Sequence, residues 1–253
     1  MAHPATRRCV RPVSRFGGAA RPGNPGVRAS SKFERIAPAK FPGPCGSTLR
    51  ERVEVPVTTT TYPTLGALLA AVRGCRGCEG QLPLGPRPVL QAGATARVLV
   101  VGQAPGARVH ASGVPWDDAS GARLRAWMGT GEDAFYDASR IAIIPMGYCY
   151  PGRGAGGDLP PRRECARLWL DLLLAALPRV ELTLLVGRHA QQHFLGARRK
   201  DTLAKTVRAW REYAPRHFPL PHPSPRNQPW LARNAWFERL LVPALRERVG
   251  RLL

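Results

Sequence analysis

The stretch RVLVVGQAPG, residues 97–106, places an apolar run rich in β-branched residues directly before a turn of glycine and proline. A short run of this kind is typical of a buried strand in a parallel sheet. Three further runs follow at 141–144 (IAII), 182–186 (LTLLV) and 218–220, with segments of helical spacing between them. The alternation predicts an α/β fold, a three-layer α/β/α sandwich whose mostly parallel central sheet has about four strands.

Composition changes near residue 60 of the 253-residue chain. Residues 1–60 carry 11 Lys and Arg against 3 acidic residues, and their Pro and Gly residues are scattered without a period. Apolar residues are not grouped there, so burial cannot offset the entropy lost on ordering. We therefore expect a basic, disordered Pro- and Gly-rich tail over 1–60 and a folded domain over 61–253.

The whole chain is strongly basic, with 38 Lys and Arg, 17 Asp and Glu and a formal net charge of +21. Such an excess favours a polyanionic partner, with nucleic acid ahead of an anionic membrane surface. No apolar run reaches the roughly 18 residues that a spanning helix needs, and residues 1–20 lack the apolar core of a secretory signal. We expect a cytoplasmic protein that works as a monomer and does not associate with membranes.

The segment Gly102–Gly106 lies at the carboxyl end of the first predicted strand, where open parallel sheets bind their ligands. An ordinary strand–helix turn would account for its glycines and proline alone. The chain continues through Gly113, Pro115 and Trp116, which would bring a large aromatic face close to exposed backbone N–H groups. Enzymes that flip a base out of DNA need this combination of stacking and edge recognition.

Together with HPSPRN at 222–227, the stretch GQAPGARVHASGVPWDDASG at 102–121 resembles the paired motifs of the uracil-DNA glycosylase superfamily. The likeness is nearest to the iron–sulfur-containing, family 4-like branch and runs from about Tyr62 to the C-terminus. It implies a DNA repair enzyme that flips a deaminated base, uracil before others, out of DNA and hydrolyses its N-glycosidic bond.

The resemblance also implies roles for individual residues. Trp116 would stack on the base, and His222 would stabilise the negative charge that leaves with it, which is usually a large catalytic contribution. Contacts with the base are implied for Gly102, Gln103, Ala104, Pro105, Gly106, Trp116, Met146, Ser224 and Asn227.

A dense basic run lies between the third strand and His222, and a further arginine follows that histidine. Charge runs are commonly solvated helix faces, but this one adjoins the second motif of a strongly basic chain. We expect contacts with DNA phosphates, which give affinity without reading sequence, from Lys200, Lys205, Arg208 and Arg226.

Three positions depart from the family pattern. Gln103 and Ala104 stand where relatives carry a residue that activates water, and Pro145 aligns with the Asn that reads the uracil edge. These departures keep two alternatives open. One is a protein that binds DNA or a damaged base with little or no glycosylase activity, and the other is a glycosylase for hypoxanthine or xanthine.

His110 and Asp117 are the candidates for the missing catalytic role, because an imidazole or carboxylate beside the base could orient water or steady the sugar cation. Asp118 is a third candidate by its position in the sequence. It also directly precedes a predicted helix, where an acidic residue caps free N–H groups and complements the helix dipole. For Asp118 we favour this capping role.

The sequence has six cysteines, of which two fall in the predicted tail. The other four combine a Cys-x2-Cys pair with one Cys after the second predicted strand and one at the start of the next helix. Any one of them alone would be an ordinary buried thiol, and four thiolates fit either a 4Fe–4S cluster or structural zinc. Their order resembles the iron–sulfur branch, which implies a structural 4Fe–4S cluster, with zinc as the alternative, held by Cys75, Cys78, Cys149 and Cys165.

Overall fold

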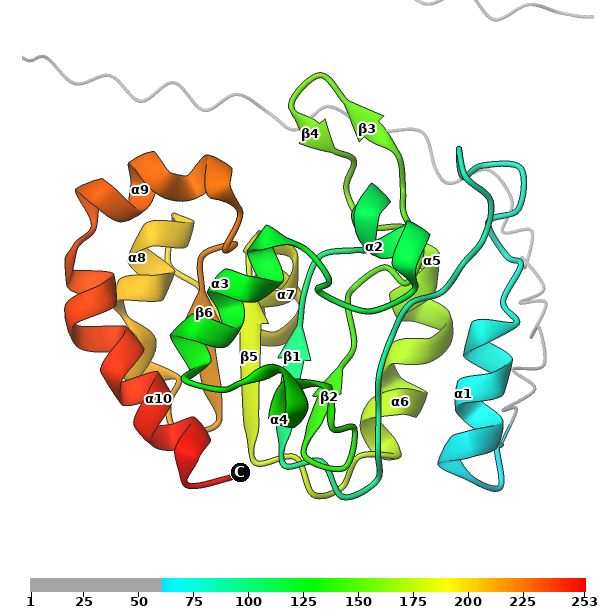
Figure 1. The fold of residues 1–253 in the computed structure, drawn as a ribbon, viewed down its shortest axis with the longest axis horizontal. Helices are drawn as coiled ribbons and strands as arrows, with labels where there is room; N and C mark the ends of the chain where they lie inside the picture. The colour runs from blue at the N-terminus through cyan, green and yellow to red at the C-terminus, as the bar shows by residue number, and fades with distance from the viewer. Residues whose placement is uncertain (1–60) are drawn as a thin grey trace, which may run out of the picture. The chain divides into compact units, whose positions relative to one another are not determined.

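The computed structural model describes residues 61–253, so the predicted tail at 1–60 lies outside the described residues. A four-stranded sheet runs through the middle of the described part, with helices on both faces (Figure 1). All neighbouring strands pair in parallel in the order β2-β1-β5-β6. The predicted three-layer α/β/α fold is confirmed. Its strands are β1 (Val98–Val101), β2 (Ile141–Ile143), β5 (Leu182–Val186) and β6 (His217–Leu220).

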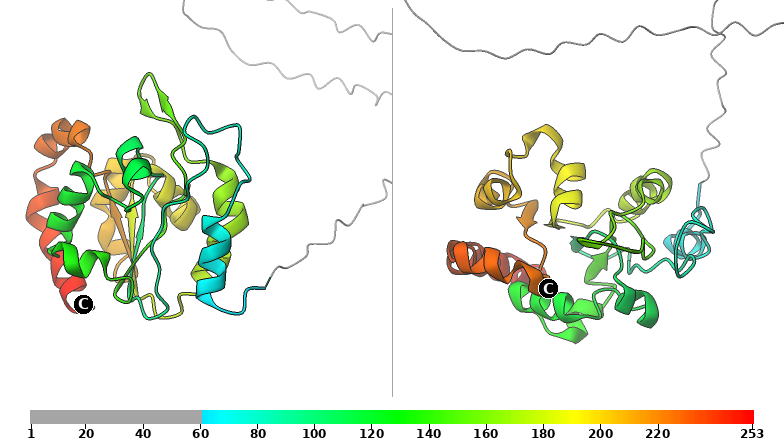
Figure 2. Two further views of the ribbon diagram at one scale, coloured as in Figure 1. Left: turned by 45° about the vertical axis from the view of Figure 1, so that its right-hand side comes forward. Right: turned by 90° about the horizontal axis from the view of Figure 1, so that it is seen from above.

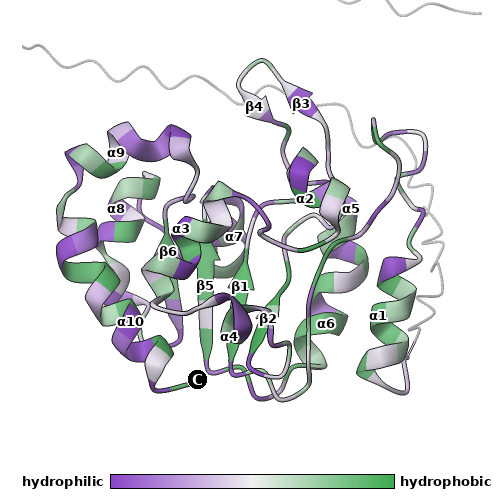
Figure 3. Cartoon of the chain, viewed as in Figure 1, coloured by the Kyte–Doolittle hydropathy of each residue, from purple (hydrophilic) through white to green (hydrophobic). Residues whose placement is uncertain are grey.

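The inner strands β1 and β5 are buried along their whole length, and apolar except at Thr183, because helices cover both faces of the sheet (Figures 2 and 3). Val98 and Val100 of β1 join the core on one face, and Leu99 and Val101 join the core on the other. The first core includes α3 (Ala119–Met128), α4 (Glu132–Tyr136) and α10 (Val242–Gly250). The second includes α1 (Leu65–Arg73), α6 (Asp171–Ala175) and α7 (Arg188–Leu195).

The strand order reverses at β1. The chain passes from β1 to β2 on one side, then returns to β5 on the other side and continues to β6. A reversal of this kind opens a crevice at the carboxyl ends of the strands, where ligands of such sheets bind. The loops after β1, β2 and β6 all begin at this edge, and two of them carry the motifs at 102–121 and 222–227.

A small antiparallel hairpin, β3 (Arg153–Gly154) and β4 (Gly157–Asp158), rises at the same edge (Figure 1). Its strands are two residues long and rich in glycine, so the sequence has no alternating pattern that would predict them. The remaining helices are α2 (Ala107–Ser112), α5 (Arg163–Cys165), α8 (Leu203–Arg208) and α9 (Gln228–Arg233), with π-helical turns at Ala166–Leu170 and Phe237–Leu241. Among the helices of residues 61–253, none has the length and apolar character needed to cross a bilayer.

Candidate functional site

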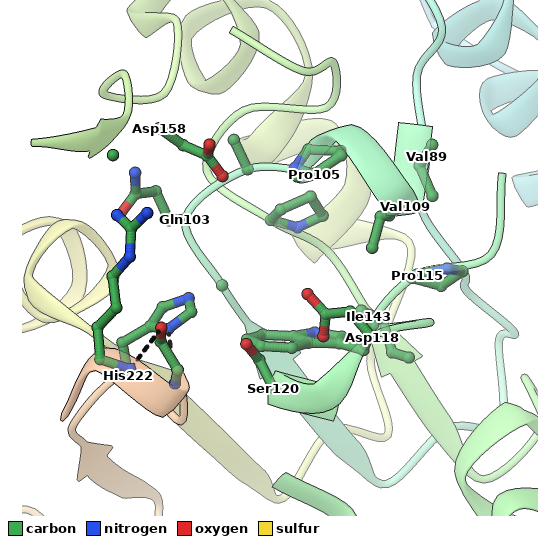
Figure 4. Close-up of a pocket in the computed structure, with 18 of the residues that line it drawn as sticks. Val89, Gln103, Pro105, Val109, Pro115, Asp118, Ser120, Ile143, Asp158 and His222 are labelled. Carbon is green, nitrogen blue, oxygen red and sulfur yellow. Dashed lines mark hydrogen bonds between the residues drawn. The ribbon is translucent and has the colours of Figure 1, made fainter. Parts of the chain in front are cut away.

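A pocket of about 370 Å³ opens at the carboxyl ends of the strands (Figure 4). Its walls come from the loops after β1, β2 and β6, from the start of α3 and from the β3–β4 hairpin. Both sequence motifs therefore meet in one place. The lining includes Gly102, Gln103, Ala104, Pro105, Gly106, Trp116, Asp118, Ser120, Pro145, Gly157, Asp158, His222, Ser224 and Arg226.

All five residues of the Gly102–Gly106 loop line the pocket. The loop after β2 fixes it from the side, because the backbone N–H groups of Met146 and Gly147 donate hydrogen bonds to its carbonyls at 3.0 and 2.9 Å. The Met146 side chain lies in the core and does not reach the pocket, whereas Pro145 does. The residue of this loop that lines the pocket is thus a proline, which has no N–H to donate.

Trp116 forms one wall of the pocket in a backbone conformation that bulky residues seldom adopt, with φ at 60°. Its ring lies against Gly102, where a Cβ would approach the ring at 2.8 Å. Its carbonyl oxygen fills the space that a Cβ on Gly121 would need. Two glycines, one from each side, therefore leave room for the indole and hold it in place.

His222 lies beside this indole, with ring centroids 5.7 Å apart and planes inclined by 35°. Its Nδ1 accepts a hydrogen bond from the Ser224 N–H at 3.2 Å. A neutral imidazole whose Nδ1 accepts carries its proton on Nε2, so the Nε2–H remains free to donate. Asn227 does not line the pocket; its Nδ2 donates to the His222 carbonyl at 2.7 Å and so fixes the loop.

Arg123 of α3 holds the same loop from a second side. Its Nη1 donates to the carbonyls of Pro223 and Ser224 at 3.4 and 3.2 Å, and its Nη2 donates to Oε1 of Gln228 at 3.1 Å. The sequence pattern missed Arg123, because nothing separates it there from the many solvated arginines of this chain. Together these bonds position the backbone that carries His222.

Burial lowers the pKa of His222 below its ordinary value of 6.5, and the carboxylates of Asp118 and Asp158 oppose that shift. The imidazole is therefore neutral at pH 7. A neutral ring with a free Nε2–H can donate a hydrogen bond to a developing anion without first losing or gaining a proton.

We expect His222 to titrate below pH 6.5 in the folded protein, and Asp118→Asn to lower its pKa further by removing an opposing carboxylate. NMR titration of the histidine ring signals measures both effects. In the unfolded chain this side chain binds a proton near pH 6.5, whereas the folded protein does not. His222 therefore reduces the free energy of unfolding as the pH falls through 6.5 toward the folded pKa. A measured pKa at or above 6.5 would contradict the assigned tautomer and burial.

The two candidates for water activation, His110 and Asp117, do not line the pocket. His110 is buried in α2, its Nδ1 has no hydrogen-bond partner within residues 61–253, and burial lowers its pKa. Asp117 is partly exposed, 3.9 Å from a guanidinium nitrogen of Arg108. Asp118 does line the pocket, and its Oδ1 accepts from the Gly121 N–H at 2.8 Å, which confirms the capping role.

Of the four basic residues assigned to DNA, Arg226 lines the pocket and the other three do not. Arg226 Nη1 donates to the Gly156 carbonyl at 3.3 Å. Lys200 and Lys205 each pair with an acidic side chain, at 2.6 and 2.9 Å. The guanidinium of Arg208 lies 5.3 Å from the centre of an indole ring. Arg226 is thus the one of the four that lines the pocket, whereas Lys200, Lys205 and Arg208 contact other side chains outside it.

Two polar residues of the pocket were not predicted from the sequence. Ser120 is buried in the first turn of α3 and faces the pocket. Asp158 reaches it from the hairpin, which carries no recognisable motif. The one available signal was the clustering of glycine around an acidic residue at 152–158, which indicates a turn but no function.

The four cysteines assigned to a metal are free thiols in this structure. Cys78 and Cys149 pack together in a small buried cluster, Cys165 is buried and Cys75 is half-buried. Burial, with a smaller contribution from the charges of the three other thiols, raises the pKa of Cys149 to about 11. The four side chains therefore share one neighbourhood, although within residues 61–253 no three His, Cys, Asp or Glu side chains are placed to hold a single metal ion.

The fold and pocket define an α/β protein that binds its ligand beyond the carboxyl ends of parallel strands. The family model of the Uracil DNA glycosylase superfamily matches residues 90–246. This match covers more than half of the chain and includes both pocket motifs. The chain therefore belongs to the uracil DNA glycosylase superfamily, which gives it a glycosylase-like function with DNA as the substrate class.

Proposed function

We propose that the protein is a DNA repair glycosylase that accepts a flipped-out deaminated base, uracil before others, and hydrolyses its N-glycosidic bond. One observation carries this proposal: the indole of Trp116 and the neutral imidazole of His222 stand side by side in the same pocket. The indole offers a flat surface on which a base stacks, and the imidazole offers a hydrogen-bond donor at the base edge.

In this mechanism the bond between the base nitrogen and C1′ of the sugar breaks, and its electron pair leaves with the base. The negative charge spreads to an oxygen of the base, which accepts a hydrogen bond from Nε2–H of His222. A donor aimed at charge that develops in the transition state is usually a large catalytic contribution. The bonds from Ser224 and Asn227 keep that donor in position before the substrate arrives.

Recognition of the base edge rests on groups other than an asparagine of the loop after β2, because Pro145 occupies that wall. The Ser120 hydroxyl and the backbone groups of Gly102–Gly106 line the same space. A proline in place of the asparagine at this wall favours a second candidate function, a glycosylase for hypoxanthine or xanthine. A protein that binds a damaged base without releasing it is the remaining alternative.

A base-release assay tests the proposal. Duplex and single-stranded oligonucleotides carrying uracil, hypoxanthine or xanthine are incubated with excess protein, and the free base and abasic strand are quantified. Release of uracil supports the proposal. Release of a purine alone moves the substrate class to that base. Tight binding of these oligonucleotides with no base released contradicts the proposed glycosylase activity. It supports the alternative, a protein that binds a damaged base without releasing it.

We further propose that the protein acts as a monomer in the cytoplasm. The loops of a single chain enclose the described pocket, which supports action as a monomer. The free thiols at Cys75, Cys78, Cys149 and Cys165 are typical of a reducing compartment.

We also propose that these four cysteines hold a structural 4Fe–4S cluster. Their shared, largely buried neighbourhood supports it, because the four thiols lie close enough for their charges to act on one another. Four thiolates also fit a structural zinc ion, which is the alternative. Bound there, the cluster would tie the 75–78 loop to the loop after β2 and to α5, and no step of base release passes through it.

We expect the purified protein to be brown and to contain about four iron atoms per chain, with Cys149→Ser losing both colour and iron. The Tm should fall as well, because a link between three segments is removed. Metal analysis, acid-labile sulfide and thermal unfolding measure these effects, and Cys45→Ser is the matched control. A colourless wild-type protein with one zinc per chain would replace the cluster by zinc, and a metal-free one would leave four buried thiols.

A further inference from the structure

The pocket holds two carboxylates, and they differ in their surroundings. Asp118 is engaged as the N-cap of α3 through its bond to the Gly121 N–H. The Asp158 backbone pairs with Arg153 in the hairpin, but its exposed side chain makes no hydrogen bond or ion pair with any other residue of 61–253. Figure 4 shows Asp158 across the pocket from Asp118 and Ser120. One carboxylate is thus fixed beside the stacking wall, and the other is free on the opposite side.

The β3–β4 hairpin that carries Asp158 is tied to both motif loops. Arg226 from the His222 loop donates to the Gly156 carbonyl at 3.3 Å, and Gln103 from the β1 loop donates to the Leu159 carbonyl at 3.2 Å. These two bonds flank Asp158 on the chain. The hairpin is therefore held beside the pocket by the same two loops that form the pocket walls.

The carboxylate of Asp158 lines the pocket beside the Gly102–Gly106 loop. Its Oδ2 lies 3.4 Å from the position that a Cβ on Gly106 would occupy, so the absence of a side chain there leaves room for it. The charge of Asp158 also acts on the imidazole of His222. A free carboxylate thus faces the same cavity as the donor that receives the leaving base.

We propose that Asp158 is the carboxylate that stabilises the sugar cation and accepts the proton of the attacking water. The inference rests on the proposed glycosylase function and assigns the role that Gln103 and Ala104 cannot fill. The two side chains expected to fill it, His110 and Asp117, lie outside the pocket.

The step balances without any further reactant. The bond from C1′ to the base nitrogen breaks and its electron pair goes to the base, which leaves positive charge on C1′ and the ring oxygen. A water oxygen bonds to C1′, and one of its protons passes to the Asp158 carboxylate. The base anion takes up a proton from solvent, and Asp158 returns its proton to solvent.

Single-turnover base release tests this role with Asp158→Asn, which removes the charge and keeps the shape. We expect a fall of about 10²-fold, the usual contribution of a general base, and partial recovery in Asp158→Glu. Asp133→Asn, an exposed aspartate in α4 that does not line the pocket, is the matched control and should retain the wild-type rate.

A second measurement separates a charge role from a structural one. Oligonucleotides carrying a cationic pyrrolidine abasic analogue or its neutral tetrahydrofuran counterpart are titrated, with free uracil present, against wild-type protein and Asp158→Asn. The wild type should bind the cationic analogue more tightly, and the variant should lose that preference while binding the neutral one equally well.

Three results would overturn the inference, and they are distinguishable. A wild type that releases no base removes the proposed function and this role with it. An active wild type with an equally active Asp158→Asn leaves the glycosylase standing and removes only this role. Equal loss of affinity for both analogues in Asp158→Asn would reduce the residue to a structural part of the hairpin.

Discussion

Replacing His222 by alanine should lower the single-turnover rate of base release by about 10²–10³-fold, the usual effect of removing one donor to a developing anion. The reason lies in the tautomer that Ser224 imposes, which leaves Nε2–H as the donor at the pocket wall. DNA affinity should change little, because phosphate contacts supply most of it. Binding to an oligonucleotide with a tetrahydrofuran abasic site measures that part separately.

A second substitution at position 222 tests how much of the rate depends on an N–H donor. His222→Gln keeps an N–H donor and should recover part of the rate that His222→Ala loses. His193→Ala, at an exposed position of α7, is the matched control and should behave as the wild type. A His222→Ala variant that releases uracil within about twofold of the wild-type rate would remove His222 from the chemistry.

Gly121→Ala should damage both stability and activity. A Cβ at this position overlaps the carbonyl oxygen of Trp116, and inserting a methyl group into a packed site typically lowers the free energy of unfolding by about 1–3 kcal/mol. Trp116 must move, and a displacement of about 1 Å at a positioning residue can lower a rate by about 10²-fold. Thermal unfolding and single-turnover base release measure the two losses.

Gly66→Ala provides the matched control, because this glycine also lies in the first turn of a helix. A Cβ there would meet only the Thr64 hydroxyl, at 3.8 Å, so alanine should be neutral or stabilising in α1. Gly121→Ala could instead unfold at the wild-type temperature and release base at the wild-type rate. The backbone of Trp116 would then be able to relax, and the close contact at Gly121 would not matter for stability or activity.

The sheet could be predicted from the sequence because its strands are buried on both faces. Runs such as RVLVV and LTLLV have no polar alternation, and that pattern has few explanations other than an inner parallel strand. The β3–β4 hairpin could not be predicted, since two-residue strands in RGAGGD have too little pattern to separate them from a loop. Strand order was equally invisible, because pairing is decided by contacts between distant segments.

For the site, the sequence identified the loops that the structure brings together, with Trp116 and His222 in them. It placed Met146 at the pocket, where the structure has Pro145, because the side of a loop that faces a cavity is set by backbone dihedrals rather than by residue type. His110 was a candidate because an imidazole in the first motif could orient water beside the base. The intervening turn of α2 directs it into the protein interior, and only coordinates show that.

The strained backbone of Trp116 has a consequence for how the free energy of binding divides between protein and DNA. A bulky residue at positive φ raises the energy of the protein by about 1–3 kcal/mol, and that cost is met once, during folding, by the packing of Gly102 and Gly121 around it. The stacking surface is therefore preorganised, and no ordering of Trp116 remains for the moment of encounter. Affinity for an extruded base is then limited by the work of unstacking that base from its neighbours in the duplex, which is smallest where the pairing is already weak.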